Sequence, residues 1–376
     1  MVKYIVEHNQ DHIDNLDTTG QTPLMVAALS GEVDVFKFVL CYSNKRNMTN
    51  EERNNILHLS VMGGSVNIVK RVLSLHAVSI ESKGQDGRTP VLMAASCGHR
   101  EVLGLLVDEG CNVKAVDNSS NNVLHLACMS GNLDTVDYIL SKEFVDIDSR
   151  GYMEQTPIMS AALKGQLHVF EILLKKGCNV QLVDTRDNNI LHLACIKRKD
   201  RIVKYILWHG IISVETKGVR GRTPIMLSAR SGCRKCFDLL LKNGSDLNAV
   251  DNFNNTILHC ASEGGYVHMI KYVHSRGKVS LDVTRPSGVT LMMIAAWYGR
   301  MKAFDYLLSK GGDVQATENK GNNVLHIACM RGRVEMVKHL LKLNLVDPNQ
   351  RNHQGMTPLQ IAEKKVFTEI VRLFHH

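Results

Sequence analysis

The sequence predicts an all-α repeat fold: a solenoid of stacked helix-turn-helix layers joined by β-hairpin-like loops, elongated and curved. Three observations predict it. A six-residue signature returns at a fixed period, residues that start and stop helices occupy matching places in each period, and no linker interrupts the chain of 376 residues. A solenoid grows in one dimension by adding small units, so a chain of this length needs no single large core.

The signature opens eleven times, and successive openings are 33 or 34 residues apart. Odd-numbered copies read like Thr223-Pro224-Ile225-Met226, and even-numbered copies read like Asn189-Ile190-Leu191-His192. Because the two forms alternate, a pair of repeats with a period of 67 residues is the unit that was duplicated. The openings are Thr22, Asn55, Thr89, Asn122, Thr156, Asn189, Thr223, Thr256, Thr290, Asn323 and Thr357.

Each period contains the signals for two helices and a loop. In one copy, Thr89-Pro90 supplies a helix N-cap and a proline at the first helical position. Ala94-Ala95 lets two helices approach closely, and Gly98 ends the first helix in a left-handed conformation. A second helix with apolar periodicity covers Val102 to Val107, and Asp117-Asn118 marks the projecting hairpin.

These residues resemble the ankyrin repeat family over the whole chain. The family's Thr-Pro-Leu-His-x-Ala core, a following glycine, a Leu-Leu run and a closing glycine recur, for example as Thr223 to Ala229, Gly232, Leu239 to Leu241 and Gly244. The resemblance implies stacked helix pairs with projecting hairpins and a function in protein–protein interaction. Two departures, Leu291 in place of proline and Arg198 in place of glycine, predict irregular stacking or a specialised contact toward the C-terminal half.

We expect eleven repeats in one continuous solenoid over residues 17–376. Residues 1–16 are expected to be the second helix of a truncated repeat, because Val2 to Val6 mirrors Val203 to Leu207, which suggests that the chain is a fragment. The expected repeat boundaries are 17–49, 50–83, 84–116, 117–150, 151–183, 184–217, 218–250, 251–284, 285–317, 318–351 and 352–376.

Five histidines recur at steps of 67 residues in the even-numbered copies. They are His58, His125, His192, His259 and His326. Metal ligands must converge within a few ångströms, whereas two repeats correspond to roughly 20 Å at about 10 Å per helix layer. The resemblance implies that each of these histidines hydrogen-bonds the neighbouring hairpin, so we expect no metal site and no cofactor.

The ten cysteines follow the repeats and predict no disulfide framework, which favours a reducing compartment. Cys128, Cys195 and Cys329 replace a small alanine and are expected to be buried. Cys233-Arg234-Lys235-Cys236 is the only Cys-x-x-Cys sequence, and flanking positive charge could lower the pKa of a thiol there. Without a second pair or a strand-helix context, we expect neither a zinc site nor a redox fold.

We expect no catalysis, because no glycine-rich phosphate loop, recurring carboxylate pair or nucleophile-base arrangement stands out. The sequence has neither a charged-then-apolar leader nor a run of about 18 apolar residues. We therefore expect a cytoplasmic location, with the nucleus as an alternative, no insertion into a membrane, and a monomer.

The expected binding surface is the concave face of the first helices together with the hairpin tips. At the first position after the small pair, seven of ten residues are apolar. These residues are Leu29, Met62, Met129, Leu163, Ile196, Trp297 and Met330. They form an adaptable apolar stripe, or neighbouring repeats partly cover them. Trp297 and Tyr298 are the predicted hot spot, because aromatic side chains dominate interface energetics.

Positive charge is the second surface feature, since the formal net charge is +8. Much of it falls at or near the hairpin tips, at Lys83, Arg88, Arg150, Arg186, Lys217, Arg220, Arg222, Arg285 and Lys320. A basic rim could steer an acidic segment of a protein partner, bind nucleic acid or anionic lipid, or be merely solvated. The modest charge and an aromatic content of 5% argue against nucleic acid.

The sequence therefore predicts a protein–protein interaction scaffold or adaptor without catalysis. The alternative is a targeting or regulatory arm of a larger enzyme, ubiquitin-ligase adaptor or ion channel whose active domain lies outside this chain. The family resemblance also raises hydroxylation of the hairpin residue Asn248. Partner identity does not follow from the fold.

Overall fold

The structure is a computed structural model that describes residues 13–277 and 280–375. In these residues every regular element is a helix, and the only β pairs are the isolated bridges Thr49–Asn55 and Thr284–Thr290. The predicted all-α repeat fold is confirmed. The proposed remnant helix at 1–16 lies outside the described residues as far as residue 12.

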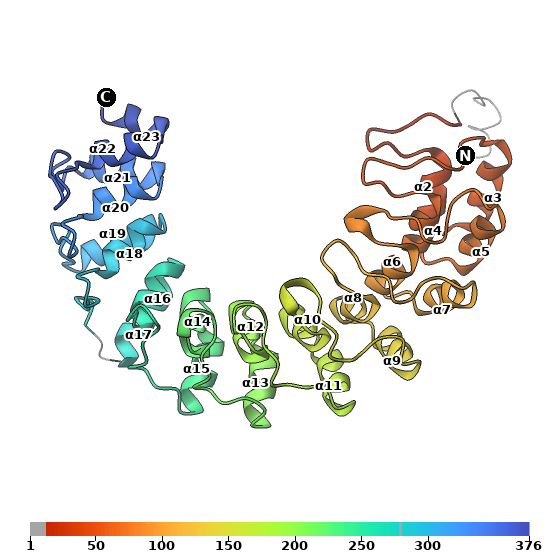
Figure 1. Cartoon of the computed structure of the whole chain (residues 1–376), viewed down its shortest axis with the longest axis horizontal. Helices are drawn as coiled ribbons and strands as arrows, with labels where there is room; N and C mark the ends of the chain where they lie inside the picture. The colour runs from red at the N-terminus through yellow and green to blue at the C-terminus, as the bar shows by residue number, and fades with distance from the viewer. Residues whose placement is uncertain (1–12, 278–279, 376) are drawn as a thin grey trace. The chain divides into compact units, whose positions relative to one another are not determined.

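The chain forms two compact units, one ending at Thr185 and the other beginning at Arg186 (Figure 1). The first unit contains helices α2 (Pro23–Ser30), α3 (Val33–Tyr42), α4 (Ile56–Gly63), α5 (Val66–Ser74), α6 (Pro90–Cys97), α7 (Arg100–Asp108), α8 (Val123–Ser130), α9 (Leu133–Ser141), α10 (Pro157–Lys164) and α11 (Leu167–Lys175). The second unit contains α12 (Ile190–Ile196), α13 (Asp200–Trp208), α14 (Pro224–Ser231), α15 (Arg234–Lys242), α16 (Ile257–Gly264), α17 (Val267–Gly277), α18 (Leu291–Trp297), α19 (Met301–Ser309), α20 (Val324–Met330), α21 (Val334–Leu343), α22 (Pro358–Lys364) and α23 (Thr368–Leu373).

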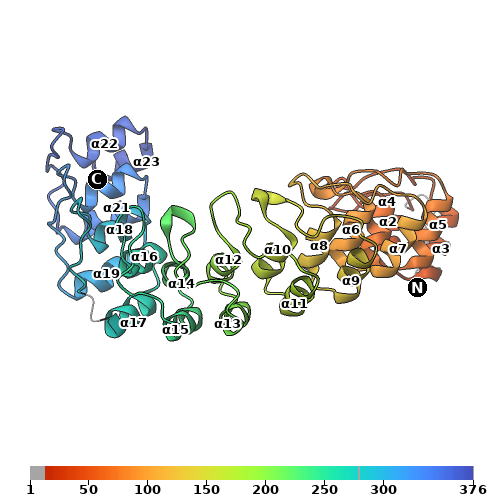
Figure 2. The same ribbon diagram turned by 60° about the horizontal axis from the view of Figure 1, so that its bottom comes forward.

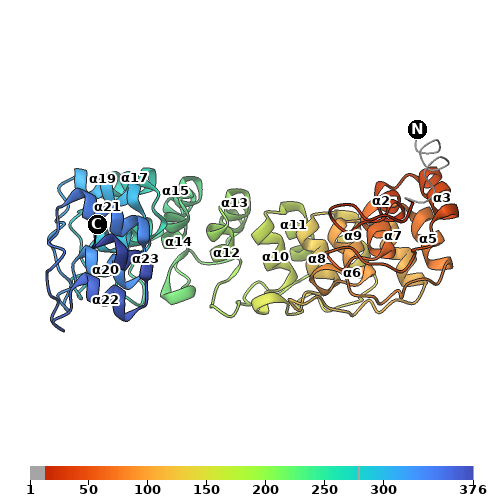
Figure 3. The ribbon, with the colours of Figure 1, turned by 90° about the horizontal axis from the view of Figure 1, so that it is seen from above.

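In each unit, consecutive helices form antiparallel pairs that stack as layers. In the first unit, α2, α4, α6, α8 and α10 contact one another in succession, and α3, α5, α7, α9 and α11 do the same beside them (Figures 1 and 2). In the second unit, the first helices α12 to α22 form an equivalent row of successive contacts (Figure 1), of which Figure 3 shows α12 beside α14 from above. Each layer is therefore held by the layers next to it in sequence, as in other repeat folds.

The residue before each first helix is extended, as an N-cap should be, but asparagine and threonine act differently. Asn122 Oδ1 accepts hydrogen bonds from the backbone N–H groups of Leu124 and His125, both at 3.1 Å. Thr22 Oγ1 accepts one bond, from Met25 N at 3.2 Å. The hydroxyls of Thr89, Thr156 and Thr223, which also precede a proline, make no capping bond. At these three starts the preset φ of proline replaces the side-chain cap.

Glycine ends many of the first helices. Gly31, Gly98, Gly165 and Gly232 have φ values of 73° to 83° directly after their helices, which is the left-handed region that glycine enters at low cost. Arg198, at the equivalent place after α12, adopts φ of 59° without being glycine. The predicted non-glycine turn at Arg198 is therefore confirmed.

The core of each layer lies between the two helices and the next layer. Second helices contribute large buried side chains, including Phe36, Phe170, Phe237 and Phe304, each 0% exposed. First helices contribute the small residues, such as Ala94 and Ala95, also 0% exposed. Small side chains on one helix leave room for an aromatic ring on the other, which gives close packing without voids.

Four of the five recurring histidines connect one layer to the loop of the next. His125 Nε2 lies 2.9 Å from the carbonyl oxygen of Gln155, and His192 Nε2 lies 3.1 Å from that of Arg222. His58 and His326 make equivalent bonds to Arg88 and Met356. Because a carbonyl only accepts, Nε2 donates in each case, and the predicted hairpin bond is confirmed at these four positions. His259 Nε2 makes no hydrogen bond within the described part of the chain.

The hairpins also connect layer to layer through their backbones. In the first unit, Asn118 N donates to Asp86 O at 2.9 Å and Thr185 N donates to Met153 O at 3.0 Å. Each of the loops Gln85–Gly87, Tyr152–Glu154 and Val219–Gly221 forms a single 3-10 turn with a non-glycine residue at positive φ in its middle. These turns place the side chains at the loop tips.

Buried histidines make the stability of the fold depend on pH. Burial lowers the pKa of His58, His125, His259 and His326, and that of His259 falls to about 4. Unfolded histidines bind protons below about pH 6.5, whereas these folded ones bind them only at lower pH, so their contribution to stability is complete above pH 7 and declines as the pH falls. Each histidine contributes up to about 1.4 kcal/mol per pH unit within its window. We expect urea midpoints, followed by circular dichroism, to fall from pH 7 to pH 5; a constant or rising midpoint would contradict the neutral histidine bridges.

Candidate interaction surface

The seven apolar side chains of the predicted stripe are neither fully exposed nor fully buried. Leu29, Met62, Met129 and Leu163 in the first unit are half-buried, and so are Ile196, Trp297 and Met330 in the second. They lie at the ends of the first helices α2, α4, α8, α10, α12, α18 and α20. Their outer atoms are accessible to a partner while their inner atoms pack on neighbouring layers. Both readings of this stripe therefore hold in part, and its role in binding stays a prediction.

The basic residues of the loops do not form a uniform rim. Arg88 is half-buried, and its guanidinium lies 3.5 Å from the carboxylate of Asp86. Arg150 Nη1 donates to the carbonyl oxygens of Glu154 at 2.6 Å and Val183 at 2.8 Å. Arg220 and Lys320 are exposed. Part of the positive charge therefore holds the loops in shape, and only part of it faces solvent.

The expectation that Arg222 projects at a hairpin tip is wrong. Arg222 is 2% exposed, with Nε 2.9 Å from Asp251 Oδ2 and Nη2 2.6 Å from Glu263 Oε2. Glu263, 4% exposed, also pairs with Arg230 Nε at 2.7 Å. Arg222 comes from the loop before α14, Asp251 from the next loop, and Glu263 from α16, so this ion-pair cluster joins consecutive layers. An unpaired charge at this depth would be far more costly than the pair.

The cluster also shifts the protonation of its acids. Burial by itself would raise the pKa of Asp251 and Glu263, but hydrogen bonds outweigh it and hold both pKa values below the ordinary range. Asn255 and Arg222 stabilise the Asp251 carboxylate, and Arg222 and Arg230 stabilise that of Glu263. Both groups are therefore charged at neutral pH, and the cluster carries no free acid for proton transfer.

A cavity of about 610 Å³ opens beside this cluster in the second unit. Its wall includes Trp297 and Tyr298, the predicted hot spot, together with Met330 from the stripe. Arg331 lies over the Trp297 ring at 4.5 Å, and Arg220 lies over the Phe253 ring at 5.8 Å. Such cation–π contacts hold guanidinium groups in place at a binding surface.

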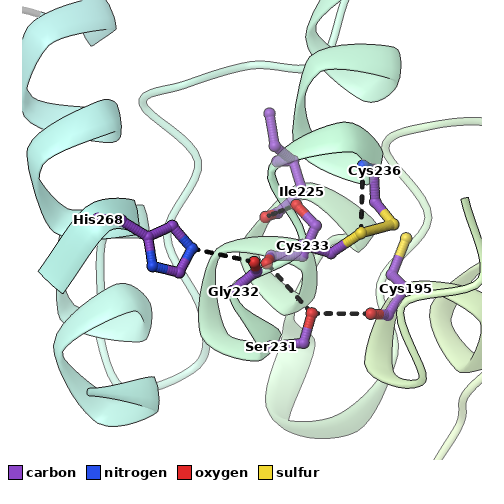
Figure 4. The surroundings of a disulfide bond; sticks show 8 residues. Cys195, Ile225, Ser231, Gly232, Cys233, Cys236 and His268 are labelled. Carbon is purple, nitrogen blue, oxygen red and sulfur yellow. Dashed lines mark hydrogen bonds between the residues drawn. A yellow bond between two sulfur atoms is a disulfide. The ribbon is translucent and has the colours of Figure 1, made fainter. Parts of the chain in front are cut away.

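Two cysteines in the second unit form a disulfide, although no pairing framework was expected. Cys233 at the N-cap of α15 is bonded to Cys236 in its first turn, and Cys233 Sγ also accepts from Cys236 N at 3.3 Å (Figure 4). The bridge spans three positions within one layer and joins no two layers. The other eight cysteines are free. Cys128, Cys195 and Cys329 are fully buried, and burial raises their pKa.

Asn248 lies exposed in a loop, where its backbone N–H donates to Asp246 Oδ1 at 2.8 Å, and its hydroxylation stays a prediction. Among residues 13–277 and 280–375, no group of three or more His, Cys, Asp or Glu side chains could hold a metal ion. None of the described helices has the length and apolar character needed to cross a membrane.

Comparison with known proteins defines the family. Models described as ankyrin repeats in three copies match residues 39–117, 109–184, 158–251 and 243–318, and a model described as ankyrin repeats in many copies matches 307–362. Because these matches cover most of the chain, it belongs to the ankyrin-repeat family.

The relatives belong to several kinds of protein. The human transient receptor potential cation channel subfamily A member 1 is 22% identical over 99% of this chain and 38% of its own length. The Gallus gallus nuclear factor NF-kappa-B p105 subunit is 31% identical over 52% of this chain and 21% of its own length. Palmitoyltransferase AKR1 of Lachancea kluyveri is 25% identical over 63% and 28%, respectively. The chain thus spans less than two fifths of each of these relatives.

The ion-pair cluster is the feature that sequence reasoning missed. Arg222 was predicted to be a loop cation, and nothing in the local sequence links it to Glu263, which is 41 positions away. Their pairing could have been found from one signal: Glu263 is the only acidic residue at the first position after the small pair. In a repeat fold, an acid at an otherwise apolar position requires a nearby cation.

Removing Glu263 should destabilise the second unit strongly. Glu263→Ala leaves Arg222 buried without one of its two carboxylates, which typically costs about 3–5 kcal/mol. Trp208 and Trp297 are the two tryptophans of the chain and both lie in the second unit, so urea unfolding followed by tryptophan fluorescence reports on it. Glu335→Ala, at an exposed position on α21, is the control and should change stability by less than about 0.5 kcal/mol. Equal effects of the two variants would show that the cluster is not important for stability.

Proposed function

We propose that this chain is a protein–protein interaction module that binds a partner through the ends of its first helices and the adjoining loops, without catalysis. The observation that carries the proposal is the set of half-buried apolar residues at the ends of the first helices, of which Trp297 and Met330 line the cavity in the second unit. Aromatic and methionine side chains that keep part of their surface accessible are typical of adaptable binding sites. The candidate contact residues remain those of the stripe, with Tyr298 and the loop cation Arg88.

The correction at Arg222 changes its proposed role. With its charge satisfied by Asp251 and Glu263, Arg222 supports the wall of the cavity and leaves contact with a partner to other cations. Substituting it would therefore disturb the fold before it disturbed recognition. Arg220, exposed at the tip of the same loop, is the better candidate for a direct contact.

A second candidate function is that the chain is the ankyrin arm of a larger protein such as an ion channel. Similarity to the human cation channel over 99% of this chain favours this candidate, since the chain covers 38% of that channel. The two candidates are compatible, because such an arm also works by binding. A full-length transcript from the same locus decides between them: an encoded membrane domain or enzyme domain supports the second.

The hot spot can be tested with a matched pair of aromatic substitutions. Trp297→Ala with Tyr298→Ala removes the aromatic wall of the cavity, whereas Trp208→Ala removes a tryptophan that is 79% exposed on a second helix. In quantitative affinity capture from the native cell type, we expect the double variant to lose its specific partners, by at least about tenfold, and the Trp208 variant to keep them. A partner list that the double variant leaves unchanged would remove these residues from the binding site.

A further inference from the structure

The loop before α18 in the second unit lacks a glycine that three related loops have at the same position. The glycines are Gly84, Gly151 and Gly218, each five residues before the N-cap of a first helix. A Cβ added to any of them would lie 2.8–2.9 Å from the ring atoms of a hydrogen-bonded histidine. The Cβ would also lie 2.3 Å, 2.6 Å and 2.8 Å from the side-chain oxygens of the asparagines that precede the histidine caps. A side chain at this place must therefore pass beside the histidine ring. In the loop before α22, Asn352 does so: its Nδ2 donates to Asn322 Oδ1 at 2.8 Å, and His326 keeps its bond to Met356.

Arg285 occupies that place in the loop before α18. The following residue is Pro286, whereas the related loops have Gln85, Tyr152 and Val219. In those loops the backbone N–H of this second residue donates to the preceding layer's asparagine at 2.9–3.2 Å. Proline has no N–H to donate. Arg285 Nε takes over, donating to Asn255 Oδ1 at 2.6 Å.

The exchange also weakens the histidine contact behind the loop. His259 is 1% exposed, and its Nδ1 accepts from the backbone N–H of Thr256 at 3.2 Å. The backbone of Val289 still faces the ring and opposes the fall in its pKa, but Nε2 makes no well-formed hydrogen bond among the described residues, whereas the related histidines donate to the loop carbonyl at this point. A weakened buried hydrogen bond is costly, so the loop geometry here is retained against a local penalty.

The loop that contains Arg285 borders the cavity of about 610 Å³. Arg285 is half-buried there, and with Nε committed to Asn255, its two terminal amino groups make no hydrogen bond or ion pair in the described part of the chain. Arg220, Lys320 and Arg331 stand exposed at the rim and likewise form no ion pair among the described residues. The only acidic residue of the lining is Glu318.

The remaining wall is apolar and lies next to the cations. Met293 and Trp297 come from α18, and Met330 comes from the end of α20. A guanidinium fork matches a carboxylate in a bidentate arrangement, while Met and Trp accept a bulky apolar side chain. Nucleic acid and lipid headgroups would satisfy the cations but would leave this apolar wall unused.

We infer that the cavity between the Arg285 loop and α18–α20 binds an acidic peptide segment of a protein partner, with an aspartate or glutamate carboxylate on Arg285 and an adjacent large apolar side chain against Trp297. This rests on the proposed interaction function and names the chemistry of its partner. Arg285 thus places a cation at a position where the three related loops have glycine. Exposed Arg220, Lys320 and Arg331 strengthen capture through complementary charge.

The binding test uses the full chain and three pools of fluorescein-labelled nonapeptides in a Gly-Ser frame. The first pool has Asp or Glu on both sides of one Leu, Ile, Met or Phe. The second replaces the acids by Asn or Gln, and the third replaces the apolar residue by Ser. In fluorescence anisotropy, we expect the first pool to bind at least about tenfold more tightly than either of the others. No preference for the first pool overturns the inference.

Two variants separate recognition from folding. Arg285→Gln should weaken binding of the first pool at least about tenfold, whereas Lys217→Gln, an exposed loop cation outside the cavity, should not. The double variant Arg285→Gly with Pro286→Val recreates the Gly218-Val219 loop. It should raise the urea midpoint of the second unit, because the loop carbonyl can approach His259 Nε2 and a backbone N–H can again donate to Asn255. It should also lose binding of the peptide. A double variant that still binds the peptide overturns the inference.

Two further probes distinguish this inference from the wider function. Arg285-dependent binding of a mixed-sequence single-stranded DNA, or of vesicles containing phosphatidylserine, at least as tight as binding of the acidic pool would assign the cavity to that ligand and overturn the peptide. If no acidic peptide binds but the Trp297 and Tyr298 variant still loses its captured partners, the peptide chemistry is wrong and the interaction function stands. If no acidic peptide binds and the Trp297 and Tyr298 variant keeps its partners, both the peptide inference and the proposed interaction surface are wrong.

Discussion

The structure depends on a hydrogen bond that four of the five even-numbered layers make to the next layer. A buried imidazole receives hydrogen bonds at the N-terminus of its own helix and donates from Nε2 to a loop carbonyl of the following layer, as His192 does to Arg222. At three of these contacts glycine stands opposite the ring, at Gly84, Gly151 and Gly218, and at the fourth Asn352 stands there and bonds the asparagine of the preceding layer. Helix start, loop conformation and layer spacing are thus fixed by one contact, and the apolar packing of the helices follows from that spacing.

At the loop before α18, where this histidine contact is weakened, the surface differs from that at the related loops. Arg285 and Pro286 replace the glycine and the N–H donor together, the contact of His259 with the loop backbone is weakened, and a cavity lies beside the altered loop. In the preceding loop, the cluster of Arg222, Asp251 and Glu263 supports the same region with charges that are paired internally. Buried ion pairs contribute little net stability when compared with apolar packing. Their location suggests that the region is adapted to hold a polar surface open.

Much of the fold could be predicted from the sequence because its determinants are local and repeated. Helix starts at Thr or Asn, glycine ends and the histidine bridges follow from residues within one or two layers. Arg222 was misassigned because loop position alone does not reveal burial; its partners Asp251 and Glu263 lie 29 and 41 positions away. The Cys233–Cys236 bond was missed because the sequence pattern does not fix the redox state. The Arg285 site could not be predicted, since the sequence shows that glycine is missing there but not that Arg285 bonds Asn255 through Nε and lies beside a cavity.

Nearest-neighbour stabilisation is the central claim, and hydrogen exchange on a histidine variant tests it most directly. His125→Ala removes the bond from α8 to the loop before α10 inside the first unit. Amides of these two layers should then exchange faster, while those of α2 and α3, whose layer lies three layers before that of α8, should keep their protection. Equal loss of protection throughout the first unit would contradict the account, because it would mean that the layers unfold as one globular core.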